Sequence, residues 1–377
     1  MSQAPHDEGA YEVAVVGGGI AGAAACRQLG QAGIQTLWLV PPPADGRERF
    51  GESLAPAARP IITKLGLEAL LGSAQHRSSN SLFSSWGSEA LVERHASVNL
   101  EGPGLVVDRN AFEQDLEAAA LETGSIMAIP TSLRALRMHG DSWRLDLADG
   151  STQAARVAID ASGRSAVIGR RLARRIHHDR QVAAVAIVSQ RSTTVTPTPT
   201  TLIEAMPDGW LYAALLPDRR LSLAYFSDPD LMPRGVSSDV TTWQQLLDRS
   251  IHVSRWIEEA EFEIDRPPRL APAGVALLDR CASESIGGCW LAVGDAAASL
   301  DPLSSHGMTT ALWTGVRGAK AAQASLSGDH AEVQEYAQAV SRGVDHFLTD
   351  RVGVYGRETR FADRPFWRRR AHPLAKD

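Results

Sequence analysis

A glycine-rich turn between an apolar strand and a small-residue helix is the feature that most limits how this chain can fold. Residues 11–16 read YEVAVV and lead into Gly17-Gly-Gly19-Ile-Ala-Gly22, a helix-forming stretch and a second apolar run, IQTLWLV. Gly17 makes the tight turn, Gly19 lets a pyrophosphate approach the backbone, and Gly22 lets helix and strand pack closely. The positive end of the helix favours phosphate. The unit therefore predicts dinucleotide binding.

One element of the dinucleotide-binding pattern is missing. An acidic residue is expected about twenty residues after the glycines, where the second strand ends, to bind the ribose. Here that strand ends Leu39-Val40-Pro41, and the nearest acids, Asp45 and Glu48, lie in the next loop. Either one of these side chains reaches back, or the ribose is held in another way.

Two more predicted strands end in glycine. One ends Asp160-Ala-Ser-Gly163, and the other ends Gly294-Asp295 and runs on through DPLSSHG into a helix. A nicotinamide dehydrogenase needs only the first glycine turn. Between these motifs, residues 182–226 are mainly strand. The order predicts an α/β fold in which a Rossmann-like nucleotide-binding domain is interleaved with a β-sheet domain.

Composition excludes several classes of protein. The net charge of −6 is unlike that of a nucleic-acid binder. Cys26, Cys281 and Cys289 show neither metal-ligand spacing nor a disulfide framework, so we expect reduced, buried thiols and no metal site. The polar N-terminus and the absence of a long apolar run predict a cytoplasmic protein without a membrane segment.

The three glycine-bearing strand ends together resemble the flavoprotein monooxygenases related to p-hydroxybenzoate hydroxylase. The resemblance implies FAD in its extended form, with Asp295 on the ribityl chain and Arg109 reaching the cofactor; an N-cap role is the alternative for Asp295. It also implies an FAD-binding domain over 1–75, 101–180 and 270–345, a substrate domain over 76–100 and 181–269, and a C-terminal extension over 346–377. The cofactor-binding residues expected on this basis are Gly17, Gly19, Gly22, Ser53, Arg109, Asp160, Gly163, Gly294, Asp295, Pro302, Ser305, Gly307 and Met308.

A closer resemblance comes from Gly51-Glu52-Ser53-Leu54, followed by Pro56 and an LGL helix. This pattern is similar to the branch that holds the flavin-dependent tryptophan halogenases and their non-halogenating relatives. Further segments, such as SWGS at 85–88 and DGW at 208–210, resemble the subgroup that matures tryptophylquinone-dependent amine oxidases and dehydrogenases. The substrate-pocket residues expected from the resemblance, with core packing as the alternative for each, are Trp86, Trp210 and Tyr212.

Two diagnostic parts of the halogenases are absent. They need a lysine between flavin and substrate, and this chain has no lysine between Lys64 and Lys320. Their W-x-W-x-I-P signature is replaced by Trp210-Leu-Tyr212-Ala-Ala-Leu. The resemblance then favours a monooxygenase that activates O₂ as a flavin C4a-hydroperoxide and hydroxylates a tryptophan or indole-like group. A halogenase, a non-catalytic flavoprotein partner of a precursor protein, and a reductase remain alternatives.

The candidate catalytic residues are His306 and Glu52. His306 could donate or accept a proton near neutral pH, or merely cap the helix that follows it. Glu52 could lie beside the flavin or cap the helix after it. We expect a surface location for Arg368-Arg369-Arg370, with guidance of an acidic protein substrate as the alternative role. NADH or NADPH, or a separate flavin reductase, is the expected reductant, and an aromatic small molecule or a tryptophan in a peptide or protein is the expected substrate.

Overall fold

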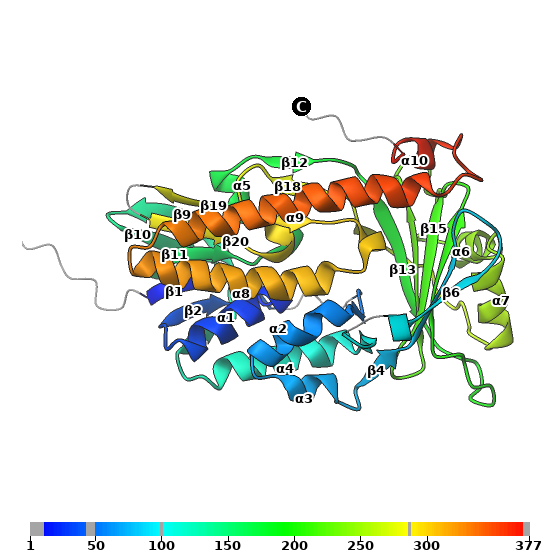
Figure 1. Cartoon of the computed structure of the whole chain (residues 1–377), viewed down its shortest axis with the longest axis horizontal. Coiled ribbons are helices and arrows are strands. Elements are labelled where there is room, and N and C mark those ends of the chain that lie inside the picture. Colours follow the sequence, from blue (N-terminus) through cyan, green and yellow to red (C-terminus); the bar gives the residue numbers. More distant parts are fainter. Residues whose placement is uncertain (1–10, 43–49, 99–100, 286–287, 372–377) are drawn as a thin grey trace, which may run out of the picture.

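A parallel arrangement around β1 (Tyr11–Val16) forms the nucleotide-binding half of the molecule (Figure 1). The computed structural model describes residues 11–42, 50–98, 101–285 and 288–371. β1 pairs in parallel with β2 (Thr36–Leu39) and β11 (Thr152–Asp160), and β11 pairs in parallel with β20 (Gly288–Ala292). The carboxyl ends of β1, β11 and β20 therefore lie at one edge of the sheet. The other strands of this eight-stranded sheet are β8 (Ile126–Ile129), β9 (Leu133–His139), β10 (Ser142–Leu147) and β19 (Ala282–Ser285).

Small residues bring helix α1 (Ile20–Gln31) into close contact with helix α8 (Gly307–Leu326). A Cβ atom on Gly315 would lie 2.4 Å from the carbonyl oxygen of Ala21, so a larger residue does not fit at this crossing. The alanines of α1 are almost completely buried there. This packing fixes the beginning of α8 next to the glycine turn that precedes α1.

A second sheet of seven strands faces the first (Figure 1). Helices α6 (Val240–Leu247) and α7 (His252–Glu259) cover its outer face, where Trp243 is fully buried. The inner face is turned towards the nucleotide-binding half. In spatial order the strands are β17 (Arg269–Pro272), β13 (Val182–Val188), β16 (Leu221–Ser227), β15 (Gly209–Leu215), β14 (Thr201–Met206), β5 (Ser81–Ser85) and β6 (Val92–His95).

Helix α9 (Ala331–Gly356) extends from the first sheet to the second (Figure 1). Helix α10 (Pro365–Arg368) follows it and lies over the seven-stranded sheet, where the indole nitrogen of Trp367 donates to the carbonyl oxygen of Met206 at 2.9 Å. The C-terminal part of the chain thus joins the two halves.

Shorter elements complete the described chain. The helix predicted after residue 54 is broken, because Gly66 adopts a positive φ of 70° between α2 (Arg59–Lys64) and α3 (Glu68–Leu71). The remaining α-helices and strands are α4 (Arg109–Leu121), α5 (Gly169–Leu172), β3 (Ser53–Leu54), β4 (His76–Ser79), β7 (Gly104–Val107), β12 (Arg175–His177), β18 (Ala276–Leu278) and β21 (Ala298–Ser299).

The predicted fold class is confirmed. The chain alternates between the two halves, because β5 leaves the first part of the sequence to pair in parallel with β14, more than a hundred residues later. The domain boundaries given above remain predictions.

Candidate active site

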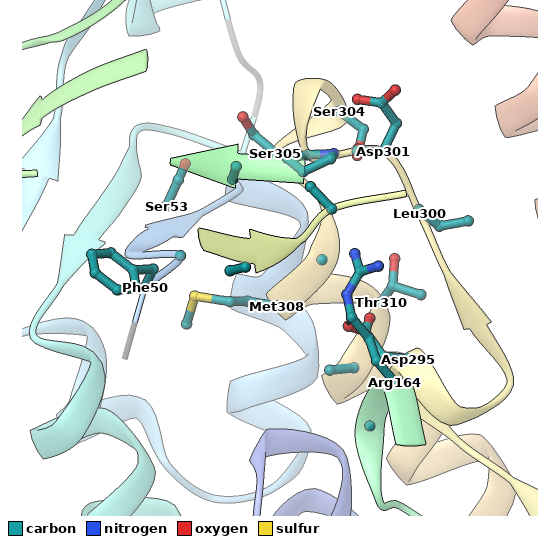
Figure 2. A pocket seen from close by; sticks show the side chains of 18 of the residues that line it. Phe50, Ser53, Arg164, Asp295, Leu300, Asp301, Ser304, Ser305, Met308 and Thr310 are labelled. Atoms are coloured by element: carbon teal, nitrogen blue, oxygen red, sulfur yellow. Dashed lines mark hydrogen bonds and ion pairs between the residues drawn. The ribbon is translucent and has the colours of Figure 1, made fainter. Parts of the chain in front are cut away.

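A cavity of about 400 Å³ lies between the two sheets. One side is formed by the glycine turn before α1 and by the first turn of α8, and the other by the inner face of the seven-stranded sheet. Figure 2 shows Met308 and Thr310 at the beginning of α8, near Asp295 and Arg164. The predicted site residues that line it are Gly19, Glu52, Ser53, Arg109, Gly163, Trp210, Tyr212, Asp295, Pro302, Ser305, Gly307 and Met308. Motifs as distant as residues 19 and 308 therefore meet in one place.

The glycines of the first turn play different parts. Gly17 has a φ of 126°, and a Cβ there would lie 2.2 Å from the carbonyl oxygen of Ala161. A Cβ on Gly22 would lie 2.0 Å from the carbonyl oxygen of Gly17. Both positions are needed for close packing and neither lines the cavity. Gly19 differs, because a Cβ there would have no atom within 4 Å, which leaves open space for a ligand.

Asp160 lies outside the cavity, contrary to its predicted place beside the cofactor. Its side chain is completely buried, and one carboxylate oxygen accepts hydrogen bonds from the backbone N–H groups of Ile168 and Gly169, both at 2.8 Å. The other oxygen accepts from the N–H of Ser162 at 3.0 Å. Asp160 thus holds the turn that presents Gly163 to the cavity.

Asp295 forms an ion pair with Arg164, a residue that sequence reasoning did not select. The Arg164 Nε and an Asp295 carboxylate oxygen are 3.5 Å apart, and Arg164 also donates to the carbonyl oxygen of Gly274 at 2.7 Å (Figure 2). Arg175 donates to the backbone oxygen of Asp295 at 3.2 Å. Burial, and then the positive charge of Arg164, lower the pKa of Arg175. The sequence could have indicated Arg164 as a site residue, because it directly follows Gly163 at the end of a predicted strand.

The segment before α8 borders the cavity. Asp301 caps the turn at Pro302–Ser304, since its carboxylate accepts from the backbone N–H of Leu303 at 3.0 Å. Helix α8 then begins at Gly307, so its positive end faces the cavity. His306 precedes that helix, but its side chain is exposed and does not line the cavity. Gly294, also predicted in the site, lies behind the lining and donates to the Thr314 hydroxyl at 2.8 Å.

Glu52 and Tyr212 face one another from opposite halves. Glu52 is only 4% exposed, and its Oε2 accepts from the backbone N–H of Gly51 at 3.1 Å. Its Oε1 has no hydrogen-bond partner among the residues that the structure describes. Burial, then the negative charge of Glu52 and a hydrogen bond between the two side chains, raise the pKa of Tyr212 well above its ordinary value. Arg109 holds the adjoining loop by donating to the carbonyl oxygen of Gly51 at 2.8 Å.

The inner face of the seven-stranded sheet combines aromatic and small side chains. Trp210 stacks on Phe226 with ring centroids 4.0 Å apart and planes 18° from parallel. The small residues that line the cavity from this sheet are Ala183, Val185, Ser222, Ala224 and Ala271. They leave room for a flat ligand beside the aromatic rings.

Trp86 does not line the cavity, although it was predicted to do so. Its indole N–H donates to the carbonyl oxygen of Val354 at 2.9 Å, and its ring packs against Trp367 with centroids 5.0 Å apart. It therefore belongs to an aromatic cluster behind Trp210, together with Tyr355. No sequence motif pointed to Tyr355, whereas Trp367 lies in a Phe366-Trp367 pair that also resembles the subgroup named above.

The arginine run near the C-terminus is not a simple surface run. Arg370 is 1% exposed, donates to Asp228 at 2.6 Å, and lies 3.8 Å from the centroid of the Phe366 ring. Arg369 pairs with Asp228 and Asp230. These bonds fasten the C-terminal segment to the end of β16.

Asp45 and Glu48, the two candidates for the ribose, lie outside the described residues.

The residues present fit FAD. Two helix beginnings and two arginines, Arg109 and Arg164, provide positive potential for a pyrophosphate, and the space above Gly19 allows its close approach. Asp295 offers a carboxylate for hydroxyl groups, and the bare oxygen of Glu52 offers a further acceptor. The fold and site together define an FAD-dependent oxidoreductase.

The chain belongs to the tryptophan halogenase family, whose model matches residues 95–376. LodB of Marinomonas mediterranea, which carries the name of an FAD-dependent oxidoreductase, is 24% identical over 96% of both chains. The fold is similar to that of the myxobacterial chondrochloren halogenase CndH (TM-score 0.84, 20% identity, 96% of this chain and 86% of the other). It is also similar to that of the peptidyl tryptophan dihydroxylase QhpG (TM-score 0.72, 20% identity, 98% and 80%).

These findings confirm the predicted flavoprotein branch and the predicted FAD cofactor. Within the described residues, no helix combines the length and the apolar character that crossing a bilayer requires.

Proposed function

We propose that the protein is a monooxygenase that hydroxylates a tryptophan or another indole-like group, free or carried by a peptide or protein. The observation that carries the proposal is the makeup of the cavity wall: Trp210, Phe226 and Tyr212 form an aromatic side, and no lysine occurs among the described lining residues. Lys64 is exposed at the end of α2, and Lys320 lies on α8 outside the cavity. The likeness to QhpG, named as a peptidyl tryptophan dihydroxylase, supports the same substrate class.

The roles of the chain follow from its geometry. Gly19, Ser53, Arg109, Gly163 and Asp295 bind the cofactor, and the positive end of α8 stabilises negative charge on it. When bound, reduced FAD supplies the electrons that activate molecular oxygen.

The walls of the cavity act on the substrate. Trp210 and Tyr212 orient the aromatic ring, while Pro302 and Met308 exclude water on the cofactor side. Glu52 is positioned to hold or pass a proton. His306 has no part in the proposal, because its side chain is exposed.

Halogenation is the second candidate, favoured by the family match and by the likeness to CndH. The test is to incubate the FAD-loaded protein, with NADH or with a separate flavin reductase, with indole and with a tryptophan-containing peptide, in the presence and absence of bromide. Mass spectrometry should show addition of oxygen in both conditions. Brominated product would overturn the proposal, and FAD binding without any NADH or oxygen consumption would instead favour a non-catalytic partner.

A further inference from the structure

Glu52 stands where two cavities meet. Besides the main cavity, it lines a small surface pocket of about 40 Å³, and Arg109 is the other residue that the two linings share. Asn110 and Asp218 form an exposed rim of the small pocket. The rest of its lining is Val107, Asp108, Ile187, Leu216, Pro217 and Arg220. A space of this size holds roughly two or three water molecules.

The carboxylate of Glu52 is incompletely bonded. Oε2 accepts from the N–H of Gly51. Oε1 has no hydrogen-bond partner within the described part of the chain, although only 4% of the residue is exposed. A buried oxygen without a partner is costly, so water or a ligand is expected to reach it. Glu52 lines both the main cavity and the small surface pocket, so water in either space lies next to its side chain.

Charged and titratable groups flank Glu52 on both sides. On the side of the main cavity lies Tyr212, whose electrostatic neighbours also include Arg77. On the side of the surface pocket lie Asp108, Arg109, Asp218 and Arg220. The Glu52 carboxylate therefore lies between the main cavity and the exposed rim of the surface pocket.

The proposed reaction needs a proton inside the cavity. Hydroxylation of an aromatic C–H group by O₂ and NADH consumes one proton from solvent and yields the C–OH product, NAD⁺ and one water molecule. A cavity that excludes bulk water needs a route for this proton. The inference below rests on the proposed function only for the proton that hydroxylation consumes. Reduction of FAD also takes up protons, and it does so with any substrate.

We propose that Glu52 carries protons between the surface pocket and the main cavity. A water molecule in the surface pocket donates a proton to Oε1, and the neutral side chain passes it to a water molecule or ligand atom in the main cavity. Glu52 then returns to its carboxylate form, and no electrons move in this step. Tyr212 is the neighbouring hydroxyl on the cavity side.

The test follows proton uptake without any substrate. FAD-loaded protein is reduced by a radiolytic pulse of carbon dioxide radical anions, which donate electrons without protons, while flavin absorbance reports electron uptake and a pH indicator in weakly buffered solution reports proton uptake. In the Glu52→Gln variant, proton uptake should slow by roughly a hundredfold relative to wild type. Glu259→Gln, the same change at an exposed side chain at the end of α7, should have no effect.

A second pair of variants keeps the test decisive if Glu52→Gln loses FAD or fails to fold. Asn110→Trp should plug the rim of the surface pocket and slow proton uptake, whereas Asn110→Ala should not. Unchanged proton uptake in Asn110→Trp, or in a folded, FAD-loaded Glu52→Gln variant, would overturn the inference. Neither readout depends on hydroxylation, so the failure of the proposed function would be seen separately, in the product assay.

Discussion

The indole nitrogen of Trp210 donates a hydrogen bond to the phenolic oxygen of Tyr355, at 3.2 Å, and Tyr355 in turn donates to Asp301 at 3.0 Å. Asp301 also accepts from Arg351 at 2.9 Å. The cavity wall on β15 is thereby connected, through the end of α9, to the turn before α8. All four side chains are almost completely buried.

Replacement of Tyr355 by Phe should therefore destabilise the protein. The change leaves the buried N–H of Trp210 without an acceptor and removes one donor from Asp301, at a cost of about 1–3 kcal/mol. Urea unfolding of the wild type and the variant measures this difference. Tyr11→Phe, at a half-buried residue at the start of β1, is the control and should change the free energy of unfolding much less. Equal changes in the two variants would show that the hydrogen bonds of Tyr355 do not contribute to the free energy of unfolding.

Alanine substitutions in the first glycine turn should separate folding from cofactor binding. Gly19 has an ordinary φ of −85°, so Gly19→Ala should cost about 1 kcal/mol or less in the FAD-free protein, yet weaken FAD binding strongly. Gly22→Ala should destabilise even the FAD-free protein, by about 1–3 kcal/mol or more, because its Cβ meets the oxygen of Gly17. Thermal unfolding with and without FAD, together with FAD titration, distinguishes the two. Full FAD affinity in Gly19→Ala would contradict the site.

Filling the substrate side of the cavity should leave the cofactor in place. Ala224 lines the cavity from β16, and Ala224→Leu would occupy space beside Trp210 and Phe226. Affinity for indole, measured by calorimetry on the FAD-loaded protein, should fall about tenfold or more. Ala224→Ser is the matched control of nearly unchanged volume. Unaltered indole binding by the Leu variant would place the ligand elsewhere.

Three buried tyrosines, together with the partly buried Tyr212 of the cavity wall, predict a loss of stability at high pH. Burial raises the pKa values of Tyr212, Tyr225, Tyr336 and Tyr355 above their ordinary range. In the unfolded chain these groups lose their protons near pH 10, whereas in the folded protein they keep them. The native state then binds more protons, so the free energy of unfolding falls as the pH rises through about 10 and beyond. Their phenolate absorbance should appear together with loss of circular dichroism; its appearance in folded protein would contradict the burial.

Much of the site could be predicted from the sequence because its parts stand at strand ends. Gly19, Gly163 and Asp295 follow three strands, and parallel strands place their carboxyl ends at one edge of a sheet. The branch of flavoproteins could also be predicted from the sequence, since Glu52 and Ser53 lie in a motif of fixed spacing.

Other parts had no local signal. Trp86 and Trp210 are both tryptophans at a strand or just after one, yet Trp210 lines the cavity while Trp86 packs against Trp367 from the C-terminal part of the chain. The bond between Trp210 and Tyr355 joins residues 145 positions apart. Arg370 looks solvated in a run of three arginines until its partner Asp228 is seen.

The wall behind Trp210 is built by α9 and α10, the last elements of the described chain. During synthesis, the glycine turn leaves the ribosome long before Tyr355 and Trp367 do. The nascent chain therefore exposes an unfinished pocket until these residues emerge, and FAD can be enclosed only after that. A stop codon placed before Tyr355 would open the pocket to water.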